Sequence, residues 1–509
     1  MKLSVRIFSE RDYFLYIFAA LISFLLTYWI NVHQDIINPD AICYLTAAER
    51  IGQSGISSAM QLCGQAKWPF YSVLIYSIVS ITHLSYASAA YLLNGLFSAI
   101  SIVTFILIVK ELNGSRQAIA CAAATILFWH TFNSVREYII RDHGFWAFYL
   151  ISVLLLLRFF RERKFIVAIL WNTSLIVASL FRLEGIFFLL LLPFYIFLNF
   201  SMPFSQRCMQ WLKLNTVTLF FLLLVAVAII SQPNINFKLT RLSEINDQLH
   251  HGLSLMIVRY QQAKLALAQH LLSGDSVKEA GLVLMVTMLA WYIISIITNL
   301  TWIYAGLIIY SGWRKLTAFS NNAMFVLGAY LSTNIFITFG FLWQRLFLSK
   351  RYLIALSFIL ILWIPFALAD LWKNIRYVKY RWASAAVAMA ILFSAAGNML
   401  NFGYSKTYIL QAGQWLAQSI PADASLYSND YQVMYYSHHY GDTLFQRVNT
   451  DTDTRSVLQG KWRQYNYLAL RIKIKHQNEV ADILQEISSQ PIKIFANNRG
   501  DRVLIFHIN

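Results

Sequence analysis

"NPDAICYLTAAE", residues 38–49, follows the first apolar segment of the chain, Asp12–Ile30. It places a carboxylate, Asp40, just beyond a segment long enough to cross a bilayer. An ionised side chain at a membrane edge is costly to desolvate and commonly has a role. The structural alternative is a helix cap or turn, since Asn-Pro-Asp is also favourable turn chemistry. We favour the functional role, because the acid, the preceding apolar segment and a later Lys-Trp-Pro at 67–69 occur together.

The composition identifies the class of protein. Of the 509 residues 58% are hydrophobic and only 13% are charged, which exceeds what a soluble core needs. The net charge of +17 does not indicate nucleic-acid binding, because the Lys and Arg residues fall in short clusters between apolar runs. Such clusters are typical of cytoplasmic loops. We therefore expect a protein that crosses the membrane many times.

The same clusters predict the topology. No small-residue cleavage site follows the first apolar segment, so we expect this segment to remain as an anchor with the amino terminus in the cytoplasm. Spans of roughly 20 residues are then expected near 12–31, 87–109, 117–134, 143–160, 165–181, 185–200, 214–231, 288–311, 321–342, 352–371 and 382–401. The expected fold class is a polytopic α-helical membrane protein with about eleven transmembrane helices and its carboxyl terminus outside.

Two outer loops and an outer domain follow from this topology. The transmembrane domain is expected to cover 1–403, with outer loops at 32–86 and 232–280. The apolar segment Phe70–His83 is too short to cross and is expected to lie along the outer interface. The tail, 404–509, has helical periodicity at 407–419 and 477–489 and strand patterns at 425–429, 467–474, 492–497 and 502–508. Alternating helices and strands predict a small α/β domain there.

The cysteines and histidines leave two possibilities open. Cys43 and Cys63 share the first outer loop, where an oxidising compartment would permit a disulfide, but two unrelated thiols fit equally well. The adjacent pairs at 250–251 and 438–439 are interpreted as solvated loop histidines, because no Cys or His set has zinc spacing. We therefore assign no metal site.

Charges at the outer ends of the expected spans have no role in orienting the chain. A mixed set of acids and bases at one membrane face is suited to hold a lipid phosphate while one carboxylate transfers a proton. Arg136, Glu137 and Arg141 are candidates for contact with an acceptor or for supporting the site. The structural alternative is local pairing, which we favour for Arg182 with Glu184.

The order of these features resembles the GT-C superfamily of polyprenyl-phosphate-dependent glycosyltransferases. Bacterial relatives of protein O-mannosyltransferases and the lipid A aminoarabinose transferases are the most similar members. The resemblance covers roughly the first 400 residues in order. It rests on residues 38–49, "AKWPFYSVLIYSIVSITHLSYASAAYLLNGLFSAISIVTFILIVKELNG" at 66–114, "VREYIIRDHGFWAFYLISVLLLL" at 135–157, "LFRLEGIFFLLLLPFYIF" at 180–197 and "SKRYLIALSFILILW" at 349–363.

Carried over by residue, the resemblance implies roles for five side chains. Asp40 matches the catalytic base, although alanine follows it where some relatives have a second acid. Lys67 matches a lysine that binds the donor phosphate, and only one Pro of the family's Pro-Pro pair follows it. Asp142 matches the acid of the second outer loop, placed to orient the acceptor or a divalent cation. Arg351, and with it Arg345, would bind phosphate.

The implied reaction is an inverting transfer of a sugar from a polyprenyl-phosphate donor to a periplasmic lipid, glycan or protein at a bacterial inner membrane. Asp40 would take a proton from an acceptor hydroxyl, whose oxygen attacks the anomeric carbon as polyprenyl phosphate leaves. Such a donor needs no nucleotide site, and no Gly-rich phosphate loop is present in the sequence. The alternatives are an O-antigen ligase or polymerase, with essential residues between Gln232 and Lys278, and a transporter or flippase of lipid-linked sugars. A transporter would commonly show repeated halves and interrupted spans, and the sequence suggests neither.

The topology predicts the outcome of reporter fusions. A reporter fused after Asn509 is expected to be active only outside the cytoplasm, and one inserted at Lys315 only inside it, because the positive clusters share one side. Activity of the two fusions in paired assays of intact cells checks this. A cytoplasmic carboxyl terminus would contradict the whole assignment of loops.

Overall fold

The computed structural model describes residues 10–200, 202–231, 241–317, 319–399, 403–421, 423–439, 460–475, 480–487 and 489–508. The chain forms two compact units, each described here by itself. The first comprises 1–27, 94–136 and 141–399, and the second comprises 28–93, 137–140 and 400–509. Two helices, α1 (Glu10–Val32) and α4 (Tyr86–Glu111), each contribute to both units.

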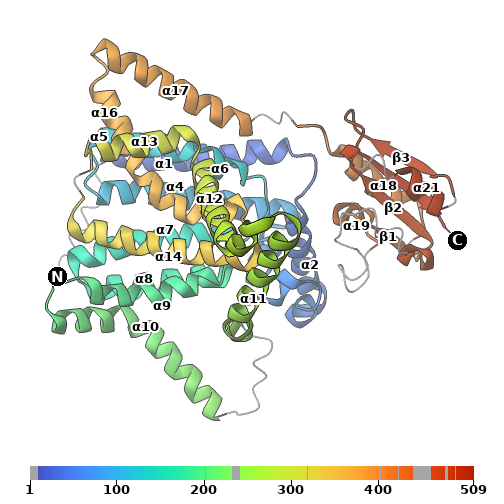
Figure 1. The fold of residues 1–509 in the computed structure, drawn as a ribbon, viewed down its shortest axis with the longest axis horizontal. Helices are drawn as coiled ribbons and strands as arrows, with labels where there is room; N and C mark the ends of the chain where they lie inside the picture. The colour runs from blue at the N-terminus through green and yellow to red at the C-terminus, as the bar shows by residue number, and fades with distance from the viewer. Residues whose placement is uncertain are drawn as a thin grey trace. The chain divides into compact units, whose positions relative to one another are not determined.

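The first unit is a bundle of long helices (Figure 1). Its central members are α7 (Asp142–Glu162), α8 (Phe165–Phe181) and α14 (Asn321–Arg345), which pack side by side. The others are α5 (Arg116–Leu127), α6 (His130–Ser134), α9 (Glu184–Tyr195) with η2 (Ile196–Leu198), α10 (Phe204–Ser231), α11 (Arg241–His270), η4 (Gly274–Glu279), α12 (Ala280–Leu300), α13 (Trp302–Trp313), η5 (Lys350–Leu353), α15 (Ile354–Leu360), η6 (Ile361–Trp363), α16 (Ile364–Lys373) and α17 (Val378–Met399).

Six of the described segments are long and apolar enough to cross a membrane. They are Tyr13–Val32, Tyr86–Glu111, Asp142–Glu162, Gly274–Leu300, Asn321–Arg345 and Lys350–Lys373. Shorter apolar helices lie at Phe70–Thr82, Phe165–Phe181 and Glu184–Leu198. The predicted class, a multi-pass α-helical protein with a small carboxyl-terminal sheet, is confirmed. The number of eleven spans stays a prediction.

Two predicted spans are wrong as continuous helices. The span expected at 288–311 ends at Leu300 and restarts at Trp302, and the one expected at 117–134 is divided by Phe128 and Trp129. Thr301 has a φ of 69°, a left-handed conformation that is costly for a β-branched residue. The sequence had suggested no interrupted span, because apolar residues continue through both breaks.

A chain of hydrogen bonds runs through the first unit. Tyr330 of α14 accepts from Trp171 of α8 at 3.1 Å and lies 2.8 Å from the hydroxyl of Ser152 of α7. One turn later on α14, Asn334 donates to Tyr149 at 2.7 Å. Polar side chains that satisfy one another in this way hold helices together where no water competes. The same pattern fixes which faces of α7, α8 and α14 meet.

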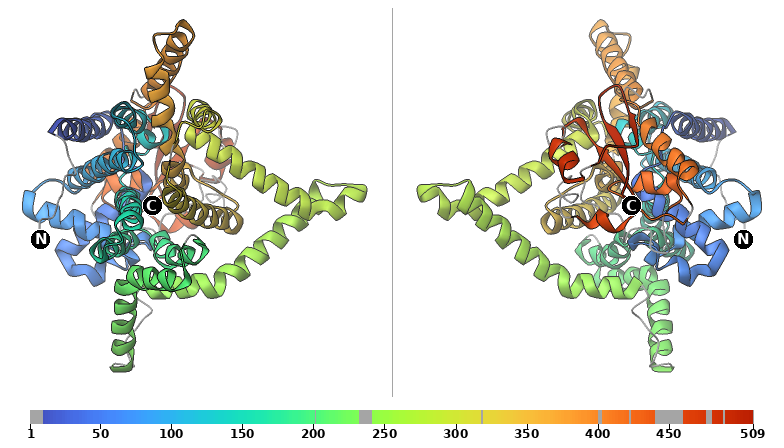
Figure 2. Two further views of the ribbon diagram at one scale, coloured as in Figure 1. Left: turned by 90° about the vertical axis from the view of Figure 1, so that its left-hand side faces the viewer. Right: turned by 90° about the vertical axis from the view of Figure 1, so that its right-hand side faces the viewer.

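The segment 232–280, expected to be an outer loop, contains a 30-residue helix, α11. Figure 2 shows α11 and α12 as two arms of a V that are joined through η4. Near this junction the Tyr260 hydroxyl donates to the Gly281 carbonyl at 3.2 Å. Residues 232–240 lie outside the described residues, as do the side chains of His250 and His251.

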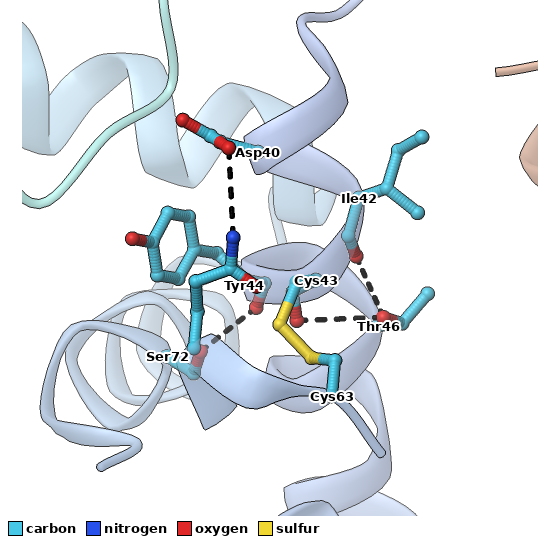
Figure 3. Close-up of a disulfide and its surroundings, with 8 residues drawn as sticks. Asp40, Ile42, Cys43, Tyr44, Thr46, Cys63 and Ser72 are labelled. Carbon is cyan, nitrogen blue, oxygen red and sulfur yellow. Dashed lines mark hydrogen bonds between the residues drawn. A yellow bond between two sulfur atoms is a disulfide. The ribbon is translucent and has the colours of Figure 1, made fainter. Parts of the chain in front are cut away.

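The second unit begins with helices where an outer loop was expected. They are α2 (Pro39–Ala59), η1 (Gly64–Lys67) and α3 (Phe70–Thr82). α3 matches the expected short helix at 70–83 and ends at His83 with a φ of 56°. Cys43, which is fully buried in α2, forms a disulfide with Cys63, which precedes η1, and their Cα atoms are 6.1 Å apart (Figure 3).

The remainder of the second unit is an α/β domain. Its sheet has the order β1-β2-β4-β3, formed by β1 (Leu426–Ser428), β2 (Tyr467–Ile472), β4 (Arg502–His507) and β3 (Lys493–Ala496). β1 pairs parallel with β2, and the other pairs are antiparallel, with Leu468 opposite Phe506. The helices are α18 (Thr407–Ser419), α19 (Tyr431–Ser437), η7 (Lys461–Gln464) and α21 (Val480–Ile487). α18, α21 and the four strands fall on the stretches predicted for the tail, whereas α19 and η7 were not predicted. Residues 476–479 and 488 of the predicted helix at 477–489 and its surroundings lie outside the described residues.

The two faces of this sheet are both buried, as the alternation of side chains requires. One face carries Ala469 and Ile505 against α18 and α19, and the other carries Leu468 and Leu470 together with Ile487 of α21. α18 and α19 approach closely at Gly413, where a Cβ atom would lie 2.4 Å from the Cβ of Tyr436. A side chain at position 413 would therefore separate the two helices.

The disulfide gives a test of the second unit. Alkylation of the native protein under non-reducing conditions is expected to leave Cys43 and Cys63 unlabelled, and reduction should expose both together, because the bond links α2 to η1. Mass spectrometry of the two tryptic peptides measures this. Cys208, which is half-buried and unbonded, is the matched control for labelling. Labelling of either bonded residue before reduction would contradict the link.

Candidate functional site

Asp40 lies in the first turn of α2, in the second unit. Pro39 is the first residue of this helix, a position that suits proline because the N–H there needs no helical partner. A carboxylate in the first turn also interacts favourably with the helix dipole. The side chain of Asp40 is half-buried, and Gln65 Nε2 donates to its Oδ1 over a long 3.5 Å (Figure 3).

Lys67 comes from the segment that the disulfide ties to α2. Cys63 precedes η1, and Lys67 is the last residue of this short helix. The Lys67 side chain is exposed, while Ala66 beside it is fully buried and anchors the segment. The disulfide thus joins the part of α2 that begins three residues after Asp40 to a cysteine four residues before Lys67, within the second unit. A single Pro, Pro69, then precedes α3.

Asn38 was treated only as part of a turn, yet it holds the start of α2. Its Oδ1 accepts from the N–H of Ile139 at 2.8 Å, and its Nδ2 donates to the carbonyl of Ile139 at 3.4 Å. These bonds join two segments about 100 residues apart in the sequence. Glu137, a candidate second acid, lies half-buried two residues before Ile139. The Asn-Pro-Asp sequence gave no signal for this partner.

Asp142, in the first unit, is bound by Arg182. The carboxylate is 4% exposed at the first turn of α7, and Arg182 lies between α8 and α9. One guanidinium nitrogen donates to Asp142, a second donates to Glu184, and Nε donates to the other Glu184 oxygen at 3.1 Å. The expected pairing of Arg182 with Glu184 is therefore present in the structure, with Asp142 as an additional partner.

An aromatic ring connects this cluster with the basic segment before α15. The Arg182 guanidinium lies 4.8 Å and that of Arg351 5.2 Å from the centre of the Tyr352 ring. Arg351 also donates to the Tyr352 hydroxyl at 3.4 Å. Arg345, at the end of α14, is exposed. Arg351 and Arg345 are the two predicted phosphate ligands of this unit, and only Arg351 is drawn into the cluster by a described contact.

Arg136 is fully buried and lies within the first unit. Its guanidinium donates to Asn133 at 2.8 Å, to Thr27 at 2.8 Å and to both oxygens of Ser23 at 3.1 Å. It also lies 4.9 Å from the centre of the Phe132 ring. These contacts tie α1 to the residues after α6, and any contact with an acceptor stays a prediction. Arg141 precedes α7 and is half-buried.

Asn299, which the sequence did not single out, organises the helix breaks. Its side chain donates to the Lys350 carbonyl at 2.7 Å and accepts from Ser357 at 2.8 Å. Its own carbonyl accepts from Trp129 at 3.2 Å and from Thr131 at 2.5 Å. Asn299 thereby fixes the backbone immediately before Arg351. The sequence offers one indication of this role, which is that Asn299 is an asparagine within a long apolar run.

The histidines and acids show no metal cluster within the described ranges. No three His, Cys, Asp or Glu side chains come together there as a metal site requires. His439 lies against backbone carbonyls, with Nδ1 2.6 Å from that of Ser437 and Nε2 2.9 Å from that of Pro421. His438 is exposed at the end of α19.

Comparison with solved structures identifies the fold. The chain is similar to the archaeal oligosaccharyltransferase AglB from Archaeoglobus fulgidus in complex with an inhibitory peptide and a dolichol-phosphate, at 10% identity and a TM-score of 0.56 over 97% of this chain and 74% of that one. It is also similar to ArnT from Cupriavidus metallidurans bound to undecaprenyl phosphate, at 13% identity and a TM-score of 0.51 over 98% of both chains. The chain has a GT-C fold. No protein-family profile matches it, and comparison with curated proteins found no match either.

At these identities the GT-C fold is what the comparisons establish. It agrees with the fold that the resemblance implied, and with the apolar helices it indicates a multi-pass membrane protein. The sugar, the acceptor and the residue roles are separate questions, because one fold supports different transfers.

The Arg182 cluster predicts a stability effect. Arg182→Ala is expected to lower the free energy of unfolding by about 3–5 kcal/mol, because it leaves Asp142 buried without its counter-charge. Removing the acids as well, in Arg182→Met with Asp142→Asn and Glu184→Gln, should restore most of this loss. Unfolding of the purified protein in detergent measures both changes. Lys278→Ala breaks an exposed pair with Asp275 and should have no measurable effect. If Arg182→Ala is as stable as Lys278→Ala, the cluster does not stabilise the fold.

Proposed function

We propose that this protein is a glycosyltransferase that moves a sugar from a polyprenyl-phosphate donor to a lipid, glycan or protein acceptor, with inversion at the anomeric carbon. The GT-C fold supports a transferase that uses a lipid-linked donor. The observation that carries the proposal is the half-buried Asp40 in the first turn of α2, which the disulfide between Cys43 and Cys63 joins to the segment that leads to Lys67. Solved GT-C proteins that carry dolichol-phosphate or undecaprenyl phosphate support the class of donor.

In the proposed reaction Asp40 is the general base. It takes the proton from an acceptor hydroxyl while the hydroxyl oxygen forms a bond to the anomeric carbon. The bond between that carbon and the phosphate oxygen breaks, and polyprenyl phosphate leaves with the bonding electron pair. Lys67, Arg345 and Arg351 stabilise the negative charge on the leaving phosphate.

Asp142 has a supporting role in this proposal. Its carboxylate is already bound by Arg182, so it would have to leave a buried ion pair to accept a proton. We assign it the orientation of the acceptor, together with Glu137 and Arg141. We place the reaction at the outer face of a bacterial inner membrane, with the amino terminus in the cytoplasm and the carboxyl-terminal domain in the periplasm.

One observation favours a second candidate, a flippase of lipid-linked sugars. The two broken helical segments, at Phe128–Trp129 and at Thr301, lie against each other through the bond from Trp129 to the Asn299 carbonyl. Interrupted helices that face one another are typical of transporter sites. The two candidates differ in outcome, because a flippase moves the lipid-linked sugar and leaves the sugar–phosphate bond intact.

The experiment that separates these candidates is mass spectrometry of envelope glycolipids and glycoproteins from cells with the protein, without it, and with Asp40→Asn. Loss of one sugar modification in both altered strains, with accumulation of the intact polyprenyl-phosphate sugar, supports the transferase and names donor and acceptor together. An unchanged envelope in the Asp40→Asn strain, with a change in the deletion strain, favours the flippase.

The base assignment predicts a separation of catalysis from donor binding. Asp40→Asn keeps the size of the side chain but loses the base, so turnover should fall by about 10²- to 10⁴-fold while donor binding changes little. Lys67→Ala should weaken donor binding, because a charge-assisted contact to phosphate is lost. Initial rates across donor concentrations, with transfer of labelled sugar as the readout, measure both effects. If folded Asp40→Asn retains near-normal sugar transfer, Asp40 is not the base, and Asp142 or Glu137 becomes the next candidate.

A further inference from the structure

The backbone of Ile37, three residues before Asp40, is held by two side chains of α19. Gln432 Nε2 donates to the Ile37 carbonyl at 2.6 Å, and the Ile37 N–H donates to the Tyr436 hydroxyl at 3.0 Å. Gln432 and Ile37 are both buried. One residue of the linker between α1 and α2 thus has both of its backbone polar groups satisfied by the carboxyl-terminal domain, about 400 residues away in the sequence.

The residues beside Ile37 are anchored in the same domain. Ile36 is buried in the hydrophobic core that α18 and α19 form over the sheet. The Asp35 carboxylate accepts from the Ser405 hydroxyl at 2.9 Å and from the Lys406 N–H at 2.6 Å, where α18 begins. A carboxylate at the amino end of a helix is favourably placed. Three consecutive linker residues are therefore fixed by the carboxyl-terminal domain.

The helix that supplies Gln432 is itself rigidly built. Asp430 caps α19, and its Oδ1 accepts from the N–H groups of Gln432 at 2.9 Å and Val433 at 3.2 Å. Its other oxygen accepts from Arg471 of β2 at 2.7 Å. Burial by itself would lower the pKa of Arg471, but Asp430 raises it above its usual value, so the guanidinium stays charged. The donor of Gln432 is thereby held in one place relative to the sheet.

From these contacts we infer that Gln432 is a positioning residue for Asp40. The carboxyl-terminal domain contacts residues 35–37, Asn38 is bonded to Ile139, and α2 begins at Pro39. The first turn of α2, which carries Asp40, therefore follows directly on residues that are held in place. The inference rests on the proposed role of Asp40 as base. It assigns the carboxyl-terminal domain a part in catalysis, because a base displaced by about 1 Å can cost roughly 100-fold in rate.

A substitution at position 432 can test this through pH. Glutamate has nearly the shape of glutamine, but its carboxyl can donate to the Ile37 carbonyl only when protonated. Leucine cannot donate at any pH. Among the described residues, the titratable or charged groups around this position include Asp430 with its partner Arg471, Tyr436 one turn along α19, and Asp35 in the linker. Tyr91, which interacts electrostatically with Tyr436 and Glu137, lies near them. All are present in every variant.

The experiment compares the full-length native protein with Gln432→Glu and Gln432→Leu in proteoliposomes between pH 5 and pH 8. The donor probes are undecaprenyl-phosphate-linked mannose, glucose and aminoarabinose with labelled sugar, and the acceptor is a total envelope extract. Gln418→Glu, on the exposed face of α18, makes the same charge change without the linker contact and is the matched control. Each kcat is expressed as a ratio to the native value at the same pH, which removes the titration of Asp40 itself.

We expect Gln432→Leu to lower kcat by about 10- to 100-fold at every pH, with the donor KM within about twofold of native. Gln432→Glu should match it at pH 8 and recover toward the native value as the pH falls, while Gln418→Glu stays native. A kcat for Gln432→Leu equal to the native kcat would overturn the inference, and so would a kcat for Gln432→Glu that does not recover at low pH.

A second readout separates this inference from the proposed function. If the native protein moves label from none of the three donors, the failure lies with the proposed function. Amide exchange over residues 35–44 then decides on the contact itself. Faster exchange in Gln432→Leu than in native protein supports the contact between Gln432 and the linker, and equal exchange overturns it.

Discussion

A backbone that leaves a helix inside an apolar environment must find new partners for its N–H and C=O groups, and this requirement organises the first unit. Where α12 ends, the Asn299 carbonyl accepts from Trp129 and Thr131, which lie at the other helix break. The Asn299 side chain then satisfies the Lys350 carbonyl, where the chain enters η5. Three irregular segments therefore depend on one residue, and they place the backbone that carries Arg351.

The buried charges obey the same constraint in two different ways. Arg182 contacts two carboxylates, Asp142 and Glu184, so that removing the guanidinium would leave two negative charges close together without a counter-charge. Arg136 instead donates to neutral oxygens of Ser23, Thr27 and Asn133. Neutral acceptors spread around a guanidinium hold it in position without cancelling its charge. The first arrangement fixes the start of α7, and the second fixes α1 against the residues after α6.

The sequence predicted those elements whose patterns are local. α18, the four strands and α3 follow from periodicity and turn residues within a few positions, and α7 and α14 follow from apolar length. The breaks at Thr301 and Trp129 could not be predicted, because each is stabilised by a partner about 170 residues away. Asp40, Lys67 and Arg351 could be named by resemblance, but Asn38, Asn299 and Gln432, which hold their surroundings, could not. Each of these residues bonds to the backbone of a residue far away in the sequence. Such a contact produces no recognisable pattern in the sequence around either residue.

The two acids considered for catalysis lie in different surroundings, and the proposal chooses between them on the contacts of Asp142. A proton taken by Asp142 would have to displace the Arg182 guanidinium inside a buried cluster, which would leave a cation facing Glu184 alone. Asp40, in the first turn of α2, accepts from the side-chain amide of Gln65 over a long 3.5 Å. Within the second unit, the disulfide between Cys43 and Cys63 and the contact of Gln432 with Ile37 hold the start of α2, which carries Asp40. In the proposed reaction Asp40 would therefore take up and release the proton without breaking the ion pair between Asp142 and Arg182.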